Sequence, residues 1–479
     1  MNKSTVIKSL IYKTVERFSV KGLGFVISIL LARMLSPEVF GQIALVTVVI
    51  NLSQSIIEGG LGTALVQNKD VDEGDYSTVF YICMAMSVLI TAVVFAGAPL
   101  VAGYYKSPEM LLPLRVYIFS VFFSSYASIL MARMQREMRF KQILYCSLTA
   151  TCVSGALAVA LAFAGAGIWT LVVYYFSHTV VNCLAMFVAV RWRPKFTFSV
   201  ERAKVLYSFG WKMLASSLMC SLYYDLRSLI IGKRISTEAL GYYDRGFQVP
   251  FVISSAIDSS VQSVMFPVLA KSQDKKNEAT ALLRRSLTVS ALLIIPAMVG
   301  LAAISDTFIR LLLTEKWLPS VPIMEVLCIG QAASALTAPN LVAIKAMGRS
   351  DIYMKLEFVR RVAMLIVLLV TVLLTNSIMA MAYSYTFSCW IDAVLCALPN
   401  GRLLGYGAGK QFGEVWKIIV AASVMAVAVW AVGLLALPMV IKLLAQMLAG
   451  VIIYAVLCWA MKIEGFLYAL NMIKGLRRA

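Results

Sequence analysis

The sequence is poor in charged side chains. Only 14% of its 479 residues are charged, and it contains a single histidine. Soluble globular chains carry roughly 25% charged and roughly 45–50% apolar residues, whereas 61% of this chain is hydrophobic. A soluble core cannot bury that much apolar surface, but a lipid bilayer can surround it. The composition therefore excludes a water-soluble globular protein and predicts a membrane protein without a sizeable soluble domain.

Sequence motifs for catalysis and metal binding are also missing. The nine cysteines show no C-x-x-C spacing, and the chain contains neither G-x-x-x-x-G-K-[ST] nor G-x-S-x-G. The first absence argues against disulfides and zinc sites, the second against ATP hydrolysis, and the third against a serine hydrolase. We therefore expect a protein that is not an enzyme and that uses no cofactor or metal.

Long apolar runs fill most of the chain. A membrane-spanning helix needs about 20 mostly apolar residues, and about fourteen segments meet that requirement. The connecting segments are all short, so the predicted fold is an all-α polytopic membrane protein. The approximate spans are 11–34, 42–64, 77–103, 111–132, 143–164, 168–190, 207–232, 246–269, 286–309, 321–346, 357–375, 378–399, 415–436 and 439–461.

The basic residues indicate how the chain crosses the membrane. The formal net charge is +19, from 43 Lys and Arg against 24 Asp and Glu. If the N-terminus is cytoplasmic and fourteen helices alternate, roughly 32 of the 43 basic residues lie inside and roughly nine outside, as the positive-inside rule requires. This predicts that both termini are cytoplasmic. It also assigns the charge to topology rather than to nucleic-acid binding. The cluster of Arg349, Lys355, Arg360 and Arg361 is predicted to set topology and to contact anionic lipid, with attraction of an anionic substrate as the alternative.

Two segments 200 residues apart resemble each other. LLARMLSPEVFGQI starts at Leu30 and IIGKRISTEALGYY at Ile230, and they share Ser, Glu and Gly at corresponding positions. The same offset later relates Glu58 to Asp258. The matched pairs in the two strings are Ser36 and Ser236, Glu38 and Glu238, and Gly41 and Gly241.

The repeat predicts how the chain is organised. The repeated unit spans six predicted helices, an even number, so both copies enter the membrane in the same orientation. A weaker echo pairs Met134 and Arg136 with Met347 and Arg349. We expect an N-terminal six-helix lobe at 1–195, a C-terminal six-helix lobe at 196–400, and two further helices with a cytoplasmic tail at 401–479.

Several strings resemble the polysaccharide flippase family of the multidrug/oligosaccharidyl-lipid/polysaccharide exporter superfamily. Besides the segment from Leu30, they are RMQREMRF at 133–140, LGYYDRGFQVP at 240–250, MFPVLAKSQD at 265–274 and EKWLPSVPIMEVLC at 315–328. The resemblance implies a MATE-like arrangement of two lobes and alternating access by rocking. It implies transport of oligosaccharide repeat units on undecaprenyl diphosphate, for capsule, exopolysaccharide or O-antigen, from the cytoplasmic to the periplasmic leaflet of a bacterial inner membrane.

The resemblance leaves other properties open. It implies membrane lipids, a polysaccharide polymerase and export machinery as partners, whereas the coupling ion could be H⁺, Na⁺ or neither. A drug or metabolite cation-coupled antiporter of the same fold is the first alternative function. A membrane-embedded polysaccharide polymerase is the second, although such enzymes generally carry a long periplasmic loop, which the predicted topology lacks.

Three cations in the first predicted helix are candidates for binding the substrate's diphosphate. Lys13, Arg17 and Lys21 follow each other at intervals of four residues, which places them on one stripe of a helix. Arg binds phosphate through two N–H donors and Lys binds it as a point charge. Cations at bilayer depth usually face a cavity or a partner. The alternative is that they snorkel to lipid headgroups near the helix end.

Four further ionisable residues are predicted to lie within the membrane. Glu58 and Asp258 are the acids related by the repeat, and Asp225 and Arg227 lie within the seventh predicted helix. An intramembrane carboxylate is a candidate for carrying a proton or binding a cation, so we assign these residues to ion coupling or to the transport cavity. The alternative is a structural role, in which each acid neutralises a nearby basic residue.

Overall fold

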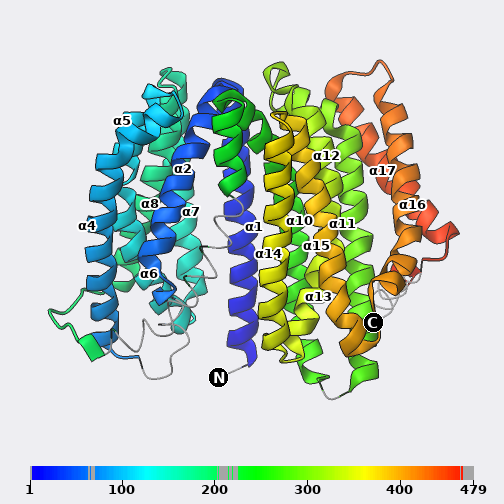
Figure 1. Ribbon diagram of the computed structural model, residues 1–479, viewed down its shortest axis with the longest axis horizontal. Coiled ribbons are helices and arrows are strands. Elements are labelled where there is room, and N and C mark those ends of the chain that lie inside the picture. The colour runs from blue at the N-terminus through cyan, green and yellow to red at the C-terminus, as the bar shows by residue number, and fades with distance from the viewer. Residues whose placement is uncertain are drawn as a thin grey trace. The chain divides into compact units, whose positions relative to one another are not determined.

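A computed structural model describes residues 3–62, 65, 71–201, 203, 214, 218, 225–273, 275–463 and 465–467 of the chain, with side chains from residue 19 onwards. All regular elements in these ranges are helices (Figure 1). The predicted all-α class is therefore confirmed. The chain divides into two compact units, Met1–Gly241 and Tyr242–Ala479. The predicted lobes at 1–195 and 196–400 remain a prediction.

In unit 1, each of the two central helices packs against two neighbours. Helix α7 packs against both α1 and α8, and α6 packs against α4 and α8 (Figure 1). The elements of this unit are α1 (Lys3–Met34), α2 (Pro37–Glu58), α4 (Glu73–Tyr104), the 3-10 turn η1 (Pro108–Met110), α5 (Leu111–Tyr117), α6 (Ser120–Arg136), α7 (Phe140–Phe163) and α8 (Ile168–Val190).

Unit 2 is built around α11, which packs against α12, α13, α16 and α17. The first turn of α10, up to Gly241, still belongs to unit 1. The elements are α10 (Thr237–Lys271), α11 (Lys276–Leu312), the 3-10 turn η2 (Glu315–Trp317), α12 (Ser320–Ala332), α13 (Ser334–Ala346), α14 (Ser350–Leu374), α15 (Ile378–Leu404), α16 (Ala408–Gly433) and α17 (Met439–Ala460).

Eleven segments of the described chain are long and apolar enough to cross a membrane. Each corresponds to one of the predicted spans. Helices α1 and α14 are 32 and 25 residues long, but charged side chains interrupt their apolar stretches. The predicted span 207–232 lies mostly outside the described residues, of which 225–234 are helical. The total of fourteen spans therefore stays a prediction.

Local signals set the helix ends. Helix α4 begins after a capping box, in which Asp72 accepts a hydrogen bond from the Asp75 backbone N–H and Asp75 accepts one from that of Asp72. Helix α2 ends at Glu58 because Gly59 adopts a left-handed conformation with φ of 52°. The prediction that this helix continues to residue 64 was wrong, since the apolar run extends past the glycine that ends the helix.

The two units share one order of elements. In each, a long helix (α4 or α11) leads to a 3-10 turn, then to a helix broken near its middle, then to two further helices. Helices α2 and α10 begin 200 residues apart, at Pro37 and Thr237. This common order supports the repeat seen in the sequence.

The weaker echo of the repeat needs a correction. Helices α6 and α13 are each followed, two residues after their last residue, by a left-handed residue: Met138 with φ of 56° and Gly348 with φ of 70°. The next residue donates its backbone N–H five residues back, from Arg139 to Met134 and from Arg349 to Ile344. Arg349 therefore corresponds to Arg139, not to Arg136. Aligning the two Met-x-Arg strings does not align the two helix-ending turns, whose left-handed residues are Met138 and Gly348.

Candidate functional site

Of the three predicted diphosphate-binding cations, the structure describes one side chain. Lys13 and Arg17 lie in α1, but their side chains are outside the described part. Lys21 is exposed. Helix α1 reaches α7 closely because Gly155 has no side chain: a Cβ there would lie 2.3 Å from Cδ1 of Ile27. Lys21 is thus accessible on a helix that is firmly packed in unit 1, and the grouping of the three cations remains a prediction.

The predicted ionisable residues of unit 1 lie in different places. Glu58 is the last residue of α2 and is half-buried. Its neighbour Ile57 accepts a 3.6 Å contact from the Cys83 thiol of α4. Asp225 is half-buried and Arg227 is only 4% exposed. Residues two apart on a helix point to different sides, so Asp225 and Arg227 do not form one paired site.

Asp258 lies in α10 of unit 2, beside a break between two half-helices. Its carboxylate is close to the hydroxyl of Ser334, the first residue of α13. Among the described residues, the buried Oδ1 of Asp258 has no hydrogen-bond partner. A carboxylate beside a broken helix can accept a proton or contribute to a small-cation site. This is the geometry closest to the predicted ion-coupling role.

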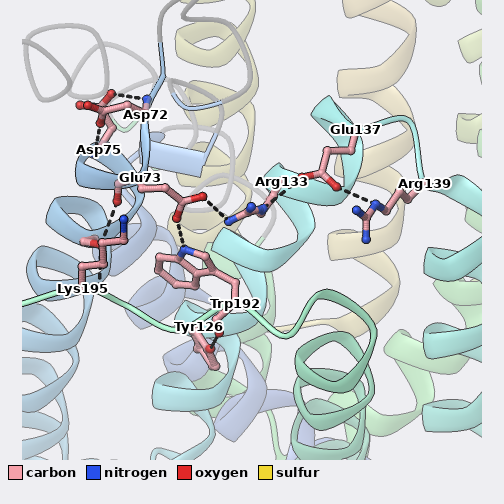
Figure 2. Close-up of polar contacts among 10 residues, drawn as sticks. Asp72, Glu73, Asp75, Tyr126, Arg133, Glu137, Arg139, Trp192 and Lys195 are labelled. Atoms are coloured by element: carbon pink, nitrogen blue, oxygen red, sulfur yellow. Dashed lines mark hydrogen bonds and ion pairs between the residues drawn. The ribbon is translucent and has the colours of Figure 1, made fainter.

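A network of charged side chains in unit 1 was not predicted from the sequence (Figure 2). Arg133 of α6 pairs with Glu73 of α4 at 2.9 Å and with Glu137 at 3.0 Å. Glu137 also pairs with Arg139 at 2.6 Å. The indole N–H of Trp192 donates to the other Glu73 oxygen at 2.6 Å. The network joins the start of α4, the end of α6 and the segment that follows α8.

Trp192 is also the centre of an aromatic cluster. It is 5% exposed, and its ring lies 6.1 to 6.3 Å from those of Tyr76, Phe80 and Tyr126. The Tyr126 hydroxyl donates to the Trp192 carbonyl at 2.7 Å. A tryptophan between two arginines, in RWRPK, is the sequence signal that could have pointed to this cluster. The basic residues there were interpreted only as topology markers.

A second unpredicted network is buried in unit 2. Arg360 of α14 binds the Asp392 carboxylate of α15 through two nitrogens, with Nη2–Oδ2 at 2.7 Å. It also pairs with Glu357 at 2.6 Å, and Arg361 lies 3.4 Å from the same carboxylate. Arg360 is 5% and Asp392 6% exposed. The assignment of Arg360 to topology and lipid contact was therefore incomplete, because its charge is used within the fold.

Three amides attach α16 to the preceding helices of unit 2. Asn340 donates to Gln411 at 2.7 Å, and Asn400 donates to Asn340 at 2.7 Å. These side chains come from α13, α16 and α15, and none is more than 1% exposed. Nearby, the Tyr406 hydroxyl donates to Glu414 at 2.6 Å. Burial, and then this hydrogen bond, raise the pKa of Tyr406.

The repeat-matched glycines meet where α2 and the first turn of α10 cross inside unit 1. A Cβ on Gly41 would lie 1.6 Å from the Thr237 carbonyl oxygen. A Cβ on Gly241 would lie 1.9 Å from the Pro37 carbonyl oxygen. The contact is reciprocal and joins backbone to backbone, which only residues without a side chain permit. The sequence repeat marked these positions without revealing that they touch.

Several curated proteins are similar to this chain in sequence. The chain is 28% identical over 306 residues to the teichuronic acid biosynthesis protein TuaB of Bacillus subtilis, covering 63% of this chain and 62% of that protein. It is 23% identical over 408 residues to the succinoglycan biosynthesis transport protein ExoT of Rhizobium meliloti, covering 85% and 80%.

Two solved structures have a similar fold. The lipid II flippase MurJ in an inward closed conformation superposes with a TM-score of 0.78 at 14% identity, covering 95% of this chain and 99% of that one. An inward-facing multidrug resistance MATE family transporter gives 0.64 at 12% identity, covering 82% and 98%. The MATE-like fold expected from the sequence is thus confirmed.

The family comparison covers more than half of the chain. The family described as polysaccharide biosynthesis protein matches residues 30–322. The match starts within α1 and ends within α12, so it includes the glycine crossing, the Trp192 cluster and the broken helix of unit 1. The resemblance noted in the sequence is confirmed, and the chain belongs to the polysaccharide biosynthesis protein family.

Proposed function

We propose that this protein is a secondary-active flippase for oligosaccharide repeat units linked to undecaprenyl diphosphate. The observation that carries the proposal is the combination of the family match at 30–322 with the fold of a lipid II flippase over 95% of the chain. Two relatives from Haloferax volcanii are named probable flippases, at 26% and 23% identity. The direction we propose is from the cytoplasmic to the periplasmic leaflet, by alternating access.

The proposed location is a bacterial inner membrane, with both termini in the cytoplasm. The excess of basic residues on one side of the predicted topology supports this orientation. Substrate units would then be built on the cytoplasmic face, and a polysaccharide polymerase and export machinery would use them on the other. Which glycan is carried depends on the shape of the transport cavity.

We assign substrate binding to the α1 cations. The substrate presents a diphosphate, and Lys21 is exposed on α1, with Lys13 and Arg17 at helical spacing before it. A hydrogen bond to a charged group contributes about 1.5–3 kcal/mol, so loss of one should slow transport about tenfold or more. For ion coupling we propose Asp258, Asp225 and Glu58 as the carboxylates, and Arg227 as a residue of the same cavity.

A second candidate function is cation-coupled export of a drug or metabolite. The fold of the multidrug transporter, with a TM-score of 0.64, favours this alternative. Such a transporter would not require a phosphate-binding group on α1. The two functions therefore differ in their substrates and in the importance of Lys21.

Reconstitution of the purified chain alone into proteoliposomes tests the proposal. Undecaprenyl-diphosphate oligosaccharide is placed in the inner leaflet, and its exposure to an external glycosidase is followed with and without a pH gradient. Protein-dependent exposure of the glycan is the expected result. Absence of exposure with several glycans, together with uptake of a cationic drug, would establish the antiporter instead.

Variants test the assigned residues in the same assay. The double variant Arg17→Ala/Lys21→Ala should lose exposure of the glycan, while Lys442→Ala should not. Lys442 lies in α17, outside the region that matches the family. Asp225→Asn should remove the dependence on the pH gradient. Normal export by the double variant would refute the diphosphate site, and full gradient dependence in Asp225→Asn would exclude Asp225 as the coupling group.

A further inference from the structure

The segment at 191–200, here called the linker segment, runs along the outer end of α4 in unit 1. It leaves α8 through Arg191, which is left-handed with φ of 54°. Its backbone N–H groups bond to α4 at two points, from Lys195 to the Ser77 hydroxyl at 3.0 Å and from Ser199 to Thr78 at 3.4 Å. Figure 2 shows the ribbon that carries Trp192 and Lys195 passing beside this helix. The linker segment is therefore fixed in place.

Apolar side chains of the linker segment point away from the protein. Trp192 is buried, but Phe196 is 99% exposed, Phe198 56% and Val200 58%. Leaving a phenylalanine in water forfeits about 25 cal/mol per Å² of apolar surface, and an aromatic side chain can bury about 150–250 Å². A fixed segment that presents two such rings to water would be unfavourable. An apolar environment outside the protein would remove this cost.

The attachment points place these rings near the start of a helix that is long and apolar enough to cross a membrane. Helix α4 starts at Glu73, so Ser77 and Thr78 lie one turn into it, about 6–8 Å along its axis. Further along, Val88, Leu89 and Val93 of α4 are 57% to 63% exposed, so the outer surface of this helix is apolar. Interfacial protein segments bury their apolar side chains about 5–10 Å into the boundary between headgroups and acyl chains.

Basic side chains accompany the exposed rings. Arg191, Arg193 and Lys195 are all exposed. None of the three forms an ion pair with an acid in the described part of the chain. The nearby acids Glu73 and Glu137 are already paired with Arg133 and Arg139. The linker segment thus combines three available cations with an apolar edge, which complements the phosphates and acyl chains of anionic lipids.

We propose that the linker segment is a binding site for anionic glycerophospholipids of the cytoplasmic leaflet. Arg191, Arg193 and Lys195 bind the headgroup phosphates, while Phe196 and Phe198 insert at the start of the acyl chains. The proposal rests on the topology of the proposed function, which places residues 191–200 on the cytoplasmic side. Because Trp192 connects the segment to Glu73 and Arg133, bound lipid would hold the ends of α4, α6 and α8 at the membrane surface.

Native mass spectrometry of the full-length chain in detergent tests this site, with phosphatidylglycerol and phosphatidylcholine as probes. The expected result is tighter binding of phosphatidylglycerol. One cation near an anionic surface changes affinity about fivefold. The variant Arg191→Gln/Arg193→Gln/Lys195→Gln should therefore lose more than tenfold in phosphatidylglycerol affinity. The control Lys271→Gln/Lys275→Gln/Lys276→Gln removes three exposed cations from unit 2 and should change it little.

The aromatic part of the site has its own control. Phe196→Ser/Phe198→Ser should lower the affinity for both lipids several-fold, because insertion of the rings does not depend on the headgroup. Phe163→Ser should change the affinity for neither lipid, although Phe163, at the end of α7, is 80% exposed. Unchanged thermal midpoints would show that the variants are folded, as expected for exposed positions.

Three outcomes would overturn the proposal. Equal affinity for the two lipids would refute headgroup recognition, and wild-type lipid affinity in the linker variants would refute the site. Displacement of phosphatidylglycerol by an equal concentration of inorganic pyrophosphate would assign the cations to a phosphate site instead of a lipid site. Labelling of the variant Thr197→Cys with an impermeant maleimide tests the topology separately, so failure of the lipid site is distinguishable from failure of the proposed function.

Discussion

Replacing Gly41 with alanine should push apart α2 and the first turn of α10. The new Cβ would lie 1.6 Å from the Thr237 carbonyl oxygen, about 1.8 Å short of ordinary van der Waals contact at 3.4 Å. Backbone atoms form the obstacle, so no side-chain rotation relieves it. The same movement would withdraw Gly241 from the Pro37 carbonyl, since the two glycines share one crossing.

The size of the effect follows from the kind of contact. Overpacking against side chains that can adjust costs about 1–3 kcal/mol. A clash with backbone should reach the upper end, about 3 kcal/mol. Gly155→Ala should cost less, because its obstacle is the flexible end of Ile27. Gly97→Ala in α4 is the matched control: no atom lies within 4 Å, and alanine favours a helix by about 0.5–1 kcal/mol over glycine.

The assay is reversible unfolding of the full-length chain in mixed detergent micelles. Gly41→Ala should lower the free energy of unfolding by about 3 kcal/mol relative to Gly97→Ala. In Gly41→Ala/Gly241→Ala the second substitution should cost less than it does alone, because the first has already separated the helices. The reasoning fails if Gly41→Ala is as stable as the Gly97→Ala control, or if the two glycine substitutions are additive.

Three other predictions concern the polar networks and use the same measurement. Arg360→Met should lower the free energy of unfolding by about 3–5 kcal/mol, because it leaves Asp392 buried and unpaired. Adding Asp392→Leu to the same chain should restore most of the lost stability. If the second substitution restored none, the ion-pair explanation would be contradicted. Trp192→Phe should cost about 1.5–3 kcal/mol, since it removes a hydrogen bond to the charged Glu73, and a neutral result would show that this bond is not stabilising. Asn340→Leu should cost about 1–3 kcal/mol for each amide partner it leaves unpaired, whereas retention of wild-type stability would contradict a stabilising role of the three buried amides.

The helices were largely predictable because lipid exposure selects long apolar runs. The span predicted at 168–190 agrees with α8 to the residue. Agreement was poorer where local backbone geometry decides the boundary, as at Gly59, where the apolar run continues beyond the helix. The count of basic residues could not predict the role of Arg360. A count of basic residues cannot show that one of them finds a buried carboxylate 32 residues later.

The candidate site was predictable only as a set of residue types. A charged residue in an apolar run stands out in a sequence, and this identified Asp258 and Asp225. The network around Trp192 did not stand out, because its members lie in polar connecting segments and at helix ends, where charges are expected. Glu73 and Trp192 are 119 residues apart, and only the attachment of the segment after α8 to α4 brings them together.

The sequence by itself determined that the chain is an all-helical membrane protein, that part of it recurs after 200 residues, and which family it resembles. These properties depend on amino-acid composition, on local apolar runs and on short sequence motifs, all of which can be read from the sequence without knowing which residues are in contact. The tertiary structure alone decided that Gly41 faces Thr237 and that Arg360 binds Asp392. An apolar run predicts only that a helix is stable in lipid or in the protein interior. A contact also depends on the orientation of two helices that are distant in the chain.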